Sequence, residues 1–176
     1  MMFKGAYISN QILELKPRLN EEIDMGIDFT GIRKINKDVK AWIQVDNNHI
    51  NYPVVQGEDN LEYVNKNIYG EFAFEGAIFL DSRNNPNFED PYTLIYGHHM
   101  ENGAMLGDLE LFKNERFFYE NTTASLTTEQ GERDIKIFAI VEADGYDELI
   151  FNPSWVSNKD EETKLLNYIE KKKIHM

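Results

Sequence analysis

The amino-acid sequence predicts a mostly β fold with some α-helix, arranged as a β-barrel with helices added to it. Three observations support this fold class. Short apolar runs alternate with turn residues from Val39 onward, as is typical of β-rich domains. Two helical patterns come before these runs, and one more comes late, at 159–173. At 176 residues, the chain is long enough to bury a core as one domain.

The first 36 residues are predicted to be helical. Apolar side chains recur at spacings of three and four between residues 9 and 25; they are Ile12, Leu15, Leu19 and Ile23. Pro17 is expected to kink or divide this helix. A second, shorter helix is expected at 28–36. We therefore expect a helical segment at 1–36 and the barrel at 37–176.

The remaining segments are short and mostly extended. The predicted strands are 41–45, 50–55, 76–81 and 93–96, followed by hairpin arms at 122–127 and 134–142. The hairpin is expected to turn through 129–132. One or two helical turns are expected at 61–65, and short helical or loop elements at 107–113 and 116–121. The helix at 159–173 has acidic residues in its first turn, which suit the helix dipole.

Composition and charge exclude several classes of function. The net charge of −13 repels phosphate backbones, so we expect no nucleic-acid partner. The basic run Lys171–Lys173 is better explained as the solvated end of a helix. The sequence has no stretch of the roughly 18–20 apolar residues that a membrane span needs, and no signal-peptide core. If the protein is exported or anchored, the anchor is expected outside this chain.

No cofactor or metal ion is expected. The chain has no cysteine, so it has neither thiolate ligands nor disulfides. His98 and His99 are adjacent in an extended segment and point to opposite faces, which makes joint ligation of one ion awkward. The acidic run at 142–148 lacks the spacing of an EF-hand calcium loop, and a solvated hairpin end explains it better.

The segment Thr93–Met100 carries the clearest chemical signal. Its sequence, T-L-I-Y-G-H-H-M, is an apolar strand that ends at Gly97 and places His98 at its tip. An imidazole held there can act as a general acid and base near neutral pH. The alternative is that His98 is a surface-loop histidine with no chemical role.

The order of segments around this histidine resembles the class B sortases, which are cysteine transpeptidases of Gram-positive bacteria. Five blocks carry the resemblance, in the order and spacing of that family. They are I-N-K-D-V-K-A-W-I-Q-V (35–45), I-N-Y-P-V-V-Q-G (50–57), G-A-I-F-L-D-S-R-N (76–84), T-L-I-Y-G-H-H-M (93–100) and M-L-G-D-L (105–109). The resemblance implies a sortase-like closed barrel whose last two strands are not in this chain.

The resemblance also implies roles for particular residues. The histidine that follows Tyr-Gly is catalytic in that family, and His98 occupies this position here. Asn60 corresponds to an asparagine of the substrate groove, Val64 and Tyr96 are candidates to line that groove, and 152–173 corresponds to a loop and helix that wall it. The residues themselves also fit simpler roles: a helix cap for Asn60, a core contact for Val64 and a buried strand tyrosine for Tyr96.

The nucleophilic cysteine of the family and its arginine lie on strands after the late helix, and this chain ends before both. None of its arginines is therefore assigned the catalytic role, and the chain by itself is expected to be inactive. The complete enzyme is expected to cleave a sorting signal of the LPXTG or NPQTN type and to join it to a peptidoglycan or pilin amine.

The resemblance implies a location on the extracellular face of the membrane of a Gram-positive bacterium. Sheet edges left open by the absent strands favour association, so a dimer through these edges is also expected. Two alternatives stay open from the sequence. One is a non-catalytic module that binds sorting-signal peptides, and the other is an unrelated small β-rich domain.

Overall fold

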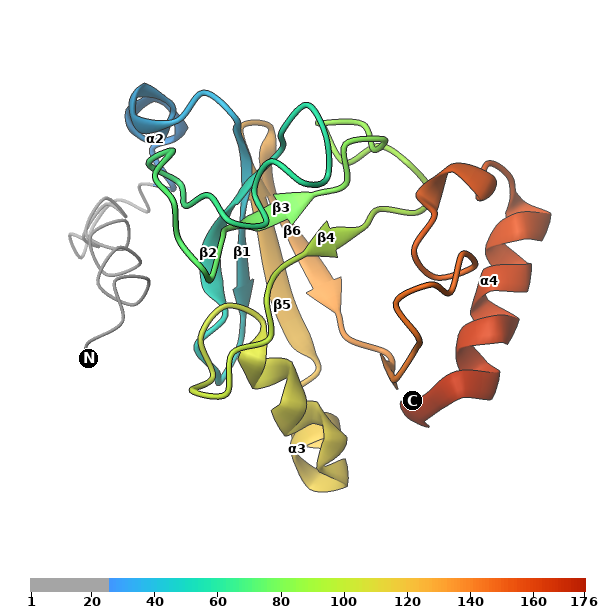
Figure 1. The fold of residues 1–176 in the computed structure, drawn as a ribbon. Coiled ribbons are helices and arrows are strands. Elements are labelled where there is room, and N and C mark those ends of the chain that lie inside the picture. The colour runs from blue at the N-terminus through green and yellow to red at the C-terminus, as the bar shows by residue number, and fades with distance from the viewer. Residues whose placement is uncertain (1–25) are drawn as a thin grey trace.

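The computed structural model describes residues 26–176, and its centre is a six-stranded sheet in the order β4-β3-β2-β1-β5-β6 (Figure 1). The strands are β1 (Val39–Val45), β2 (Asn51–Val55), β3 (Ile78–Leu80), β4 (Ile95–Tyr96), β5 (Thr123–Thr128) and β6 (Gly131–Lys136). Two further strands, β7 (Ile140–Val141) and β8 (Lys173–His175), form a separate antiparallel pair. The helix expected at 9–25 lies outside the described residues.

Strand β1 organises the sheet because it forms hydrogen bonds along both of its edges. It pairs antiparallel with β2 on one side and with β5 on the other, so that Ile43 lies opposite both Tyr52 and Leu126. β3 joins β2 in parallel and β4 joins β3 antiparallel, while β6 forms a hairpin with β5. Because a parallel neighbour needs a crossover connection, a long turn-rich segment, 56–77, links β2 to β3.

The β-rich fold class predicted from the sequence is confirmed. The pairings between residues 26 and 176 leave β4 and β6 as the outer strands of the main sheet. Closure of this sheet into a barrel stays a prediction. The division of the chain at residue 36 also stays a prediction. Phe29 and Ile32, which precede that residue, pack into the same apolar cluster as residues of the sheet.

Short helices surround the sheet, and side chains cap the starts of all those described except the helix that begins at Gly107. The helices within residues 26–176 are α2 (Phe29–Ile35), η1 (Gly107–Lys113), α3 (Glu115–Glu120), η2 (Pro153–Trp155) and α4 (Lys159–Lys172). Asp28 accepts from the amide of Gly31 at 2.9 Å, and Asn158 accepts from the amides of Asp160 and Glu161 at 3.1 Å. In Figure 1, α2 and α4 lie on opposite sides of the sheet.

Several element boundaries differ from the sequence prediction. The strands expected at 76–81 and 93–96 are shorter, and the arm expected at 134–142 ends at Lys136, since residues 140–141 pair with β8 instead. The hairpin turns through Glu129 and Gln130 alone, and β6 begins at Gly131 rather than at Asp134. Gly131 makes the tight turn possible, because it adopts φ 129° while it pairs with Thr128. The late helix ends at Lys172, since the next residue is extended and begins β8.

The apolar core consists of two clusters that share β1. Ala41 and Val45 belong to one cluster and Trp42 to the other, as alternate residues of a strand should. Val39 packs with Trp42 because the register shifts between Val39 and Ala41, as in a β-bulge, which changes the face of the sheet. Helix α2 contributes to the cluster of Trp42, and η1 and α3 contribute to the other.

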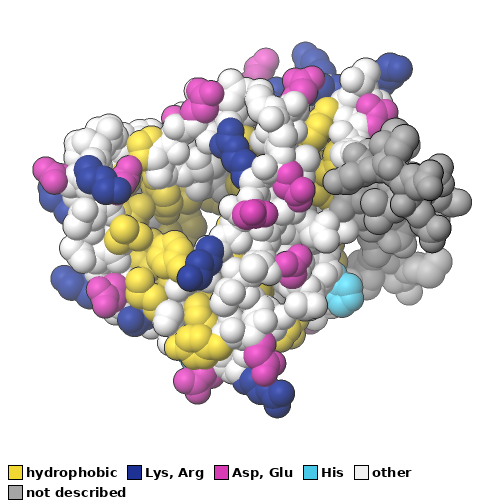
Figure 2. Space-filling model, turned by 180° about the vertical axis from the view of Figure 1, so that it is seen from behind, with side chains coloured by type: hydrophobic (Ala, Val, Ile, Leu, Met, Phe, Trp, Pro, Cys, Tyr) yellow, Lys and Arg dark blue, Asp and Glu magenta, His cyan; other side chains and the backbone are white. Residues whose placement is uncertain are grey.

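The surface near the C-terminal helix carries exposed apolar side chains. Figure 2 shows hydrophobic side chains gathered around a hollow on the side of the molecule where α4 lies. Exposed apolar residues in this part of the sequence include Phe138, Leu149 and Leu166. Within residues 26–176, no helix combines the length and the apolar character that crossing a membrane requires.

Replacement of Gly76 by alanine is expected to destabilise the fold strongly. Gly76 has φ +59°, and a β-carbon there would overlap the carbonyl oxygens of Tyr63 and Val64. We expect a loss of about 3 kcal/mol or more in the free energy of unfolding, because backbone strain and displacement add. Urea denaturation of the Gly76→Ala variant measures this loss.

Gly70→Ala is the matched control for this variant. Gly70 also has a positive φ, +77°, but open space surrounds it. Alanine there is expected to cost only about 1–2 kcal/mol, the strain of the left-handed conformation itself. Equal losses in the two variants would show that the close approach at Gly76 has no energetic consequence.

Candidate functional site

His98 lies directly after β4, in a segment that is held close to the sheet. Gly97 permits this close approach, since a β-carbon there would overlap the side chain of Ile78 and press against Leu106. The carbonyl of His98 accepts a hydrogen bond from the amide of Leu106 at 3.0 Å. His98 is half-buried, whereas His99 is exposed. The backbone of His98 is therefore fixed, as the placement of an acid–base group requires.

Asn60 and Tyr96 meet at the buried carboxylate of Asp81. Nδ2 of Asn60 donates to Oδ2 of Asp81 at 3.0 Å, and the hydroxyl of Tyr96 donates to the same oxygen at 2.9 Å. Asp81 directly follows β3, and 0% of its surface is exposed. Two predicted groove residues from separate segments thus share one acceptor.

Arg83 forms an ion pair with the same carboxylate. Its Nε donates to Oδ1 of Asp81 at 2.8 Å and its Nη2 to Oδ2 at 2.6 Å. Burial by itself raises the pKa of the Asp81 carboxyl, but hydrogen bonds from Arg83, Tyr96 and Asn60 outweigh burial and lower the pKa to about 2. Asp81 is therefore ionised near neutral pH and acts only as an acceptor.

Asp81 and Arg83 are not among the site residues that the sequence predicts. The available signal was the run I-F-L-D-S-R at 78–83, in which a carboxylate follows an apolar strand and a cation comes two residues later. A carboxylate at the end of a buried strand needs partners. The sequence does not show that Asn60 and Tyr96 are two of them.

The structure gives Asn60 a role other than helix capping. Residues 61–65 form turns and not the helical turns expected there. The side chain of Asp59 accepts from two backbone amides of this turn, at 2.8 and 3.0 Å. Oδ1 of Asn60 instead accepts from the amide of Ser82 at 2.7 Å, so both ends of its carboxamide face the β3 end.

Val64 and Tyr96 both pack against the apolar cluster that contains Trp42. The ring centroid of Tyr96 lies 5.3 Å from that of Phe79 and 6.5 Å from that of Phe151. The core contacts considered for both residues are therefore present. Their contact with a substrate stays a prediction.

Residues 150–152 are held against this network. Nη1 of Arg83 donates to Oδ1 of Asn152 at 3.1 Å, and Nη2 donates to the carbonyl of Phe151 at 3.0 Å. The hydroxyl of Tyr92 donates to the carbonyl of Ile150 at 2.7 Å. The start of the predicted wall at 152–173 is thus tied to the polar network, while α4 lies farther out (Figure 1).

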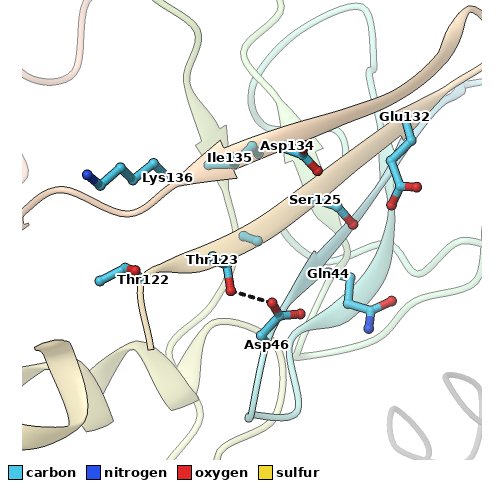
Figure 3. A pocket seen from close by; sticks show the side chains of 10 residues that line it. Gln44, Asp46, Thr122, Thr123, Ser125, Glu132, Asp134, Ile135 and Lys136 are labelled. Carbon is cyan, nitrogen blue, oxygen red and sulfur yellow. Dashed lines mark hydrogen bonds between the residues drawn. The ribbon is translucent and has the colours of Figure 1, made fainter. Parts of the chain in front are cut away.

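Two hollows on the surface are lined mainly by other residues. The larger, of about 770 Å³, lies along β1, β5 and β6, where Oγ1 of Thr123 donates to Asp46 at 2.5 Å (Figure 3). It contains none of the four predicted site residues. The smaller, of about 270 Å³, lies between Arg83 and Ser157 and adjoins the ion pair of Arg83 with Asp81.

The described residues include a group that can exchange protons and polar groups with fixed directions. Among residues 26–176, no three carboxylate or histidine side chains gather closely enough to hold a metal ion. The imidazole of His98 can exchange protons. Asn60 and Tyr96 are polar groups with fixed directions, which suits hydrogen bonding to an extended peptide.

Comparison with known proteins relates the chain to one group of enzymes. No protein-family model matches the chain. Among curated proteins, it is 36% identical over 115 residues to sortase B of Listeria monocytogenes, a match that covers 65% of this chain and 47% of that protein. The chain spans about half the length of the curated relatives it matches.

Solved structures extend the similarity to most of the chain. A class B sortase of Streptococcus pyogenes involved in pilus biogenesis is 42% identical, with a TM-score of 0.76 over 85% of this chain and 80% of that one. A mutant form of Clostridium perfringens sortase B, with serine in place of a cysteine, is 33% identical, with a TM-score of 0.85 over 96% and 80%.

Protonation of Asp81 is expected to cost stability at low pH. Its pKa is about 2 in the folded chain, against an ordinary value of 3.8. The stability that this carboxylate contributes, about 2 kcal/mol, is therefore complete above about pH 4 and is lost as the pH falls through about 2. Urea unfolding of the wild type and Asp81→Asn between neutral and strongly acidic pH measures this contribution. The free energies of unfolding of the two proteins should converge at acidic pH. If they differ by the same amount at every pH, the charge of Asp81 does not contribute to stability as expected.

Proposed function

This chain belongs to the class B sortases, and we propose that it supplies the histidine and part of the peptide groove of a cysteine transpeptidase. The proposal rests on the position of His98 directly after β4. Tyr96 of the same strand and Asn60 both donate hydrogen bonds to the carboxylate of Asp81. The similarity to the S. pyogenes relative supports it, since that match spans 85% of the chain.

His98 is the proposed general acid and base. In its protonated form it gives a proton to the amine that departs from a sorting signal, and it then takes one from the incoming amine. The hydrogen bond between the His98 carbonyl and Leu106 holds the backbone from which the imidazole is presented. Asn60, Val64 and Tyr96 are the proposed contacts for the signal, which is of the LPXTG or NPQTN type.

The covalent step requires a thiolate, and the 176 residues contain no cysteine. In the proposed reaction, this thiolate attacks the carbonyl of a threonine in the signal and forms an acyl-enzyme, while an arginine and backbone amides stabilise the oxyanion. The C. perfringens relative contains a cysteine, which is replaced by serine in the form compared above. We propose that the present chain alone does not carry out this first step.

A second candidate function is a module that binds sorting signals without cleaving them. The polar network favours it, because Asn60 and Tyr96 are both hydrogen-bonded to Asp81 within the described residues, and this arrangement needs no thiol. Peptide binding depends on shape and hydrogen bonding, whereas acyl transfer depends on the nucleophile.

The proposed acceptor is an amine of peptidoglycan or of a pilin, at the extracellular face of the membrane of a Gram-positive cell. Involvement of the S. pyogenes relative in pilus biogenesis supports the pilin alternative. We also propose a dimer through sheet edges. The proposal is supported by the position of β4 and β6 as outer strands of the main sheet.

The chain is expected to show no hydrolysis or transpeptidation of a fluorogenic sorting peptide of either motif type. The physical reason is that no acyl intermediate forms without a thiol. The measurement compares the wild type with His98→Ala and with buffer alone. Turnover that disappears in the His98→Ala variant would overturn the expectation.

Peptide titration followed by NMR tests the groove itself. Chemical-shift changes are expected around Asn60, Val64 and His98, because these residues line the proposed binding surface. Residues of the β5–β6 hairpin serve as the internal control and should not shift. The absence of any shift at about millimolar peptide, the weak end of specific binding, would remove both the transpeptidase groove and the binding module.

A further inference from the structure

One oxygen of Asp81 is the acceptor for side chains from three separate segments. Asn60, from the connection between β2 and β3, donates to Oδ2 at 3.0 Å. Tyr96, from β4, and Arg83, from the loop after β3, donate to the same oxygen at 2.9 and 2.6 Å. The carboxylate is fully buried, so water does not compete for these bonds.

These bonds fix the orientation of both proposed groove residues. The carboxamide of Asn60 donates to Asp81 at one end and accepts from the amide of Ser82 at the other. A carboxamide bonded at both ends has a single preferred orientation. Tyr96 is held at its hydroxyl by Asp81, while its ring lies between those of Phe79 and Phe151.

Arg83 extends the network to a fourth segment. Its guanidinium donates to both oxygens of Asp81, and it also donates to Asn152 Oδ1 and to the carbonyl of Phe151. Only a planar group with several donors can make these bonds together. The position of residues 151 and 152 therefore depends on the direction in which Asp81 holds Arg83.

We propose that Asp81 is a positioning residue for peptide binding: it orients Asn60 and Tyr96 directly and, through Arg83, holds residues 151 and 152 as the facing wall. This inference rests on the proposed function of the groove. A buried ion pair adds little net stability compared with apolar packing, but it fixes directions that apolar side chains leave free. Asp81 itself has no exposed surface and does not touch the peptide.

The test compares peptide affinity and amide hydrogen exchange in the wild type, Asp81→Asn and Arg83→Lys. In Asp81→Asn, affinity for a sorting peptide is expected to fall about tenfold, because charged hydrogen bonds that orient the groove are lost. Exchange at the amides of Ile150 and Phe151, which donate to the carbonyl of Asp147, should accelerate. Exchange in β1 and β5 should not change.

Arg83→Lys separates the two parts of the network. Lysine keeps the charge opposite Asp81 but lacks the planar set of donors that also reaches Asn152 and Phe151. Exchange at 150–152 is therefore expected to accelerate, while the chemical shifts of Asn60 and Tyr96 stay near those of the wild type. This variant also gives the answer if Asp81→Asn does not fold.

Asp108→Asn is the matched control, since Asp108 is another buried carboxylate, bonded to the turn residue His49 and not to the groove. It should lower stability without changing peptide affinity. Peptide binding by the wild type and by Asp81→Asn with equal affinity would overturn the inference and leave the proposed function intact. If the wild type does not bind the peptide, the proposed function fails. In that case hydrogen exchange still tests the positioning role, and unchanged exchange at 150–152 in both variants would overturn it.

Discussion

The buried carboxylate of Asp81 constrains parts of the chain that the main sheet alone does not hold together. β3 and β4 are short, and their pairing joins only Phe79 with Tyr96 and Leu80 with Ile95. A buried charge is costly unless it is paired and hydrogen-bonded. Asn60, Arg83 and Tyr96 therefore have to converge on this one group, and Arg83 carries the constraint on to residues 151 and 152.

This network is attached to a sheet whose strand β1 is paired on both edges. β1 has hydrogen-bonded neighbours on both edges, and the register shift between Val39 and Ala41 lets one strand contribute to two apolar clusters. His98 is attached to this scaffold through β4 and through its bond to Leu106. Close packing at Gly97 keeps the histidine segment against the sheet. Because β3 and β4 are antiparallel, His98 after β4 and Asp81 after β3 lie at opposite ends of this strand pair, and the side chain of Tyr96 links β4 to Asp81.

In the proposed function, the residues that bind the peptide and transfer protons are distinct from the nucleophile. The polar network is satisfied by residues within 26–176, and it needs no thiol to keep its geometry. The nucleophile adds reactivity and not shape, so a groove can form without it. Under this proposal, the transpeptidase and the peptide-binding module use the same polar network, so peptide affinity can be measured separately from turnover.

The sequence by itself determined the β-rich class, most strand positions, the helices at 28–36 and 159–173, and the histidine at the end of β4. These features depend on neighbours along the chain: alternation, capping side chains and turn residues. It did not determine the tight turn at Glu129 and Gln130, nor the partners of Asp81. Only the tertiary structure decided those, because a buried carboxylate takes its donors from whichever segments packing brings to it, and that approach leaves no periodic signal in the sequence.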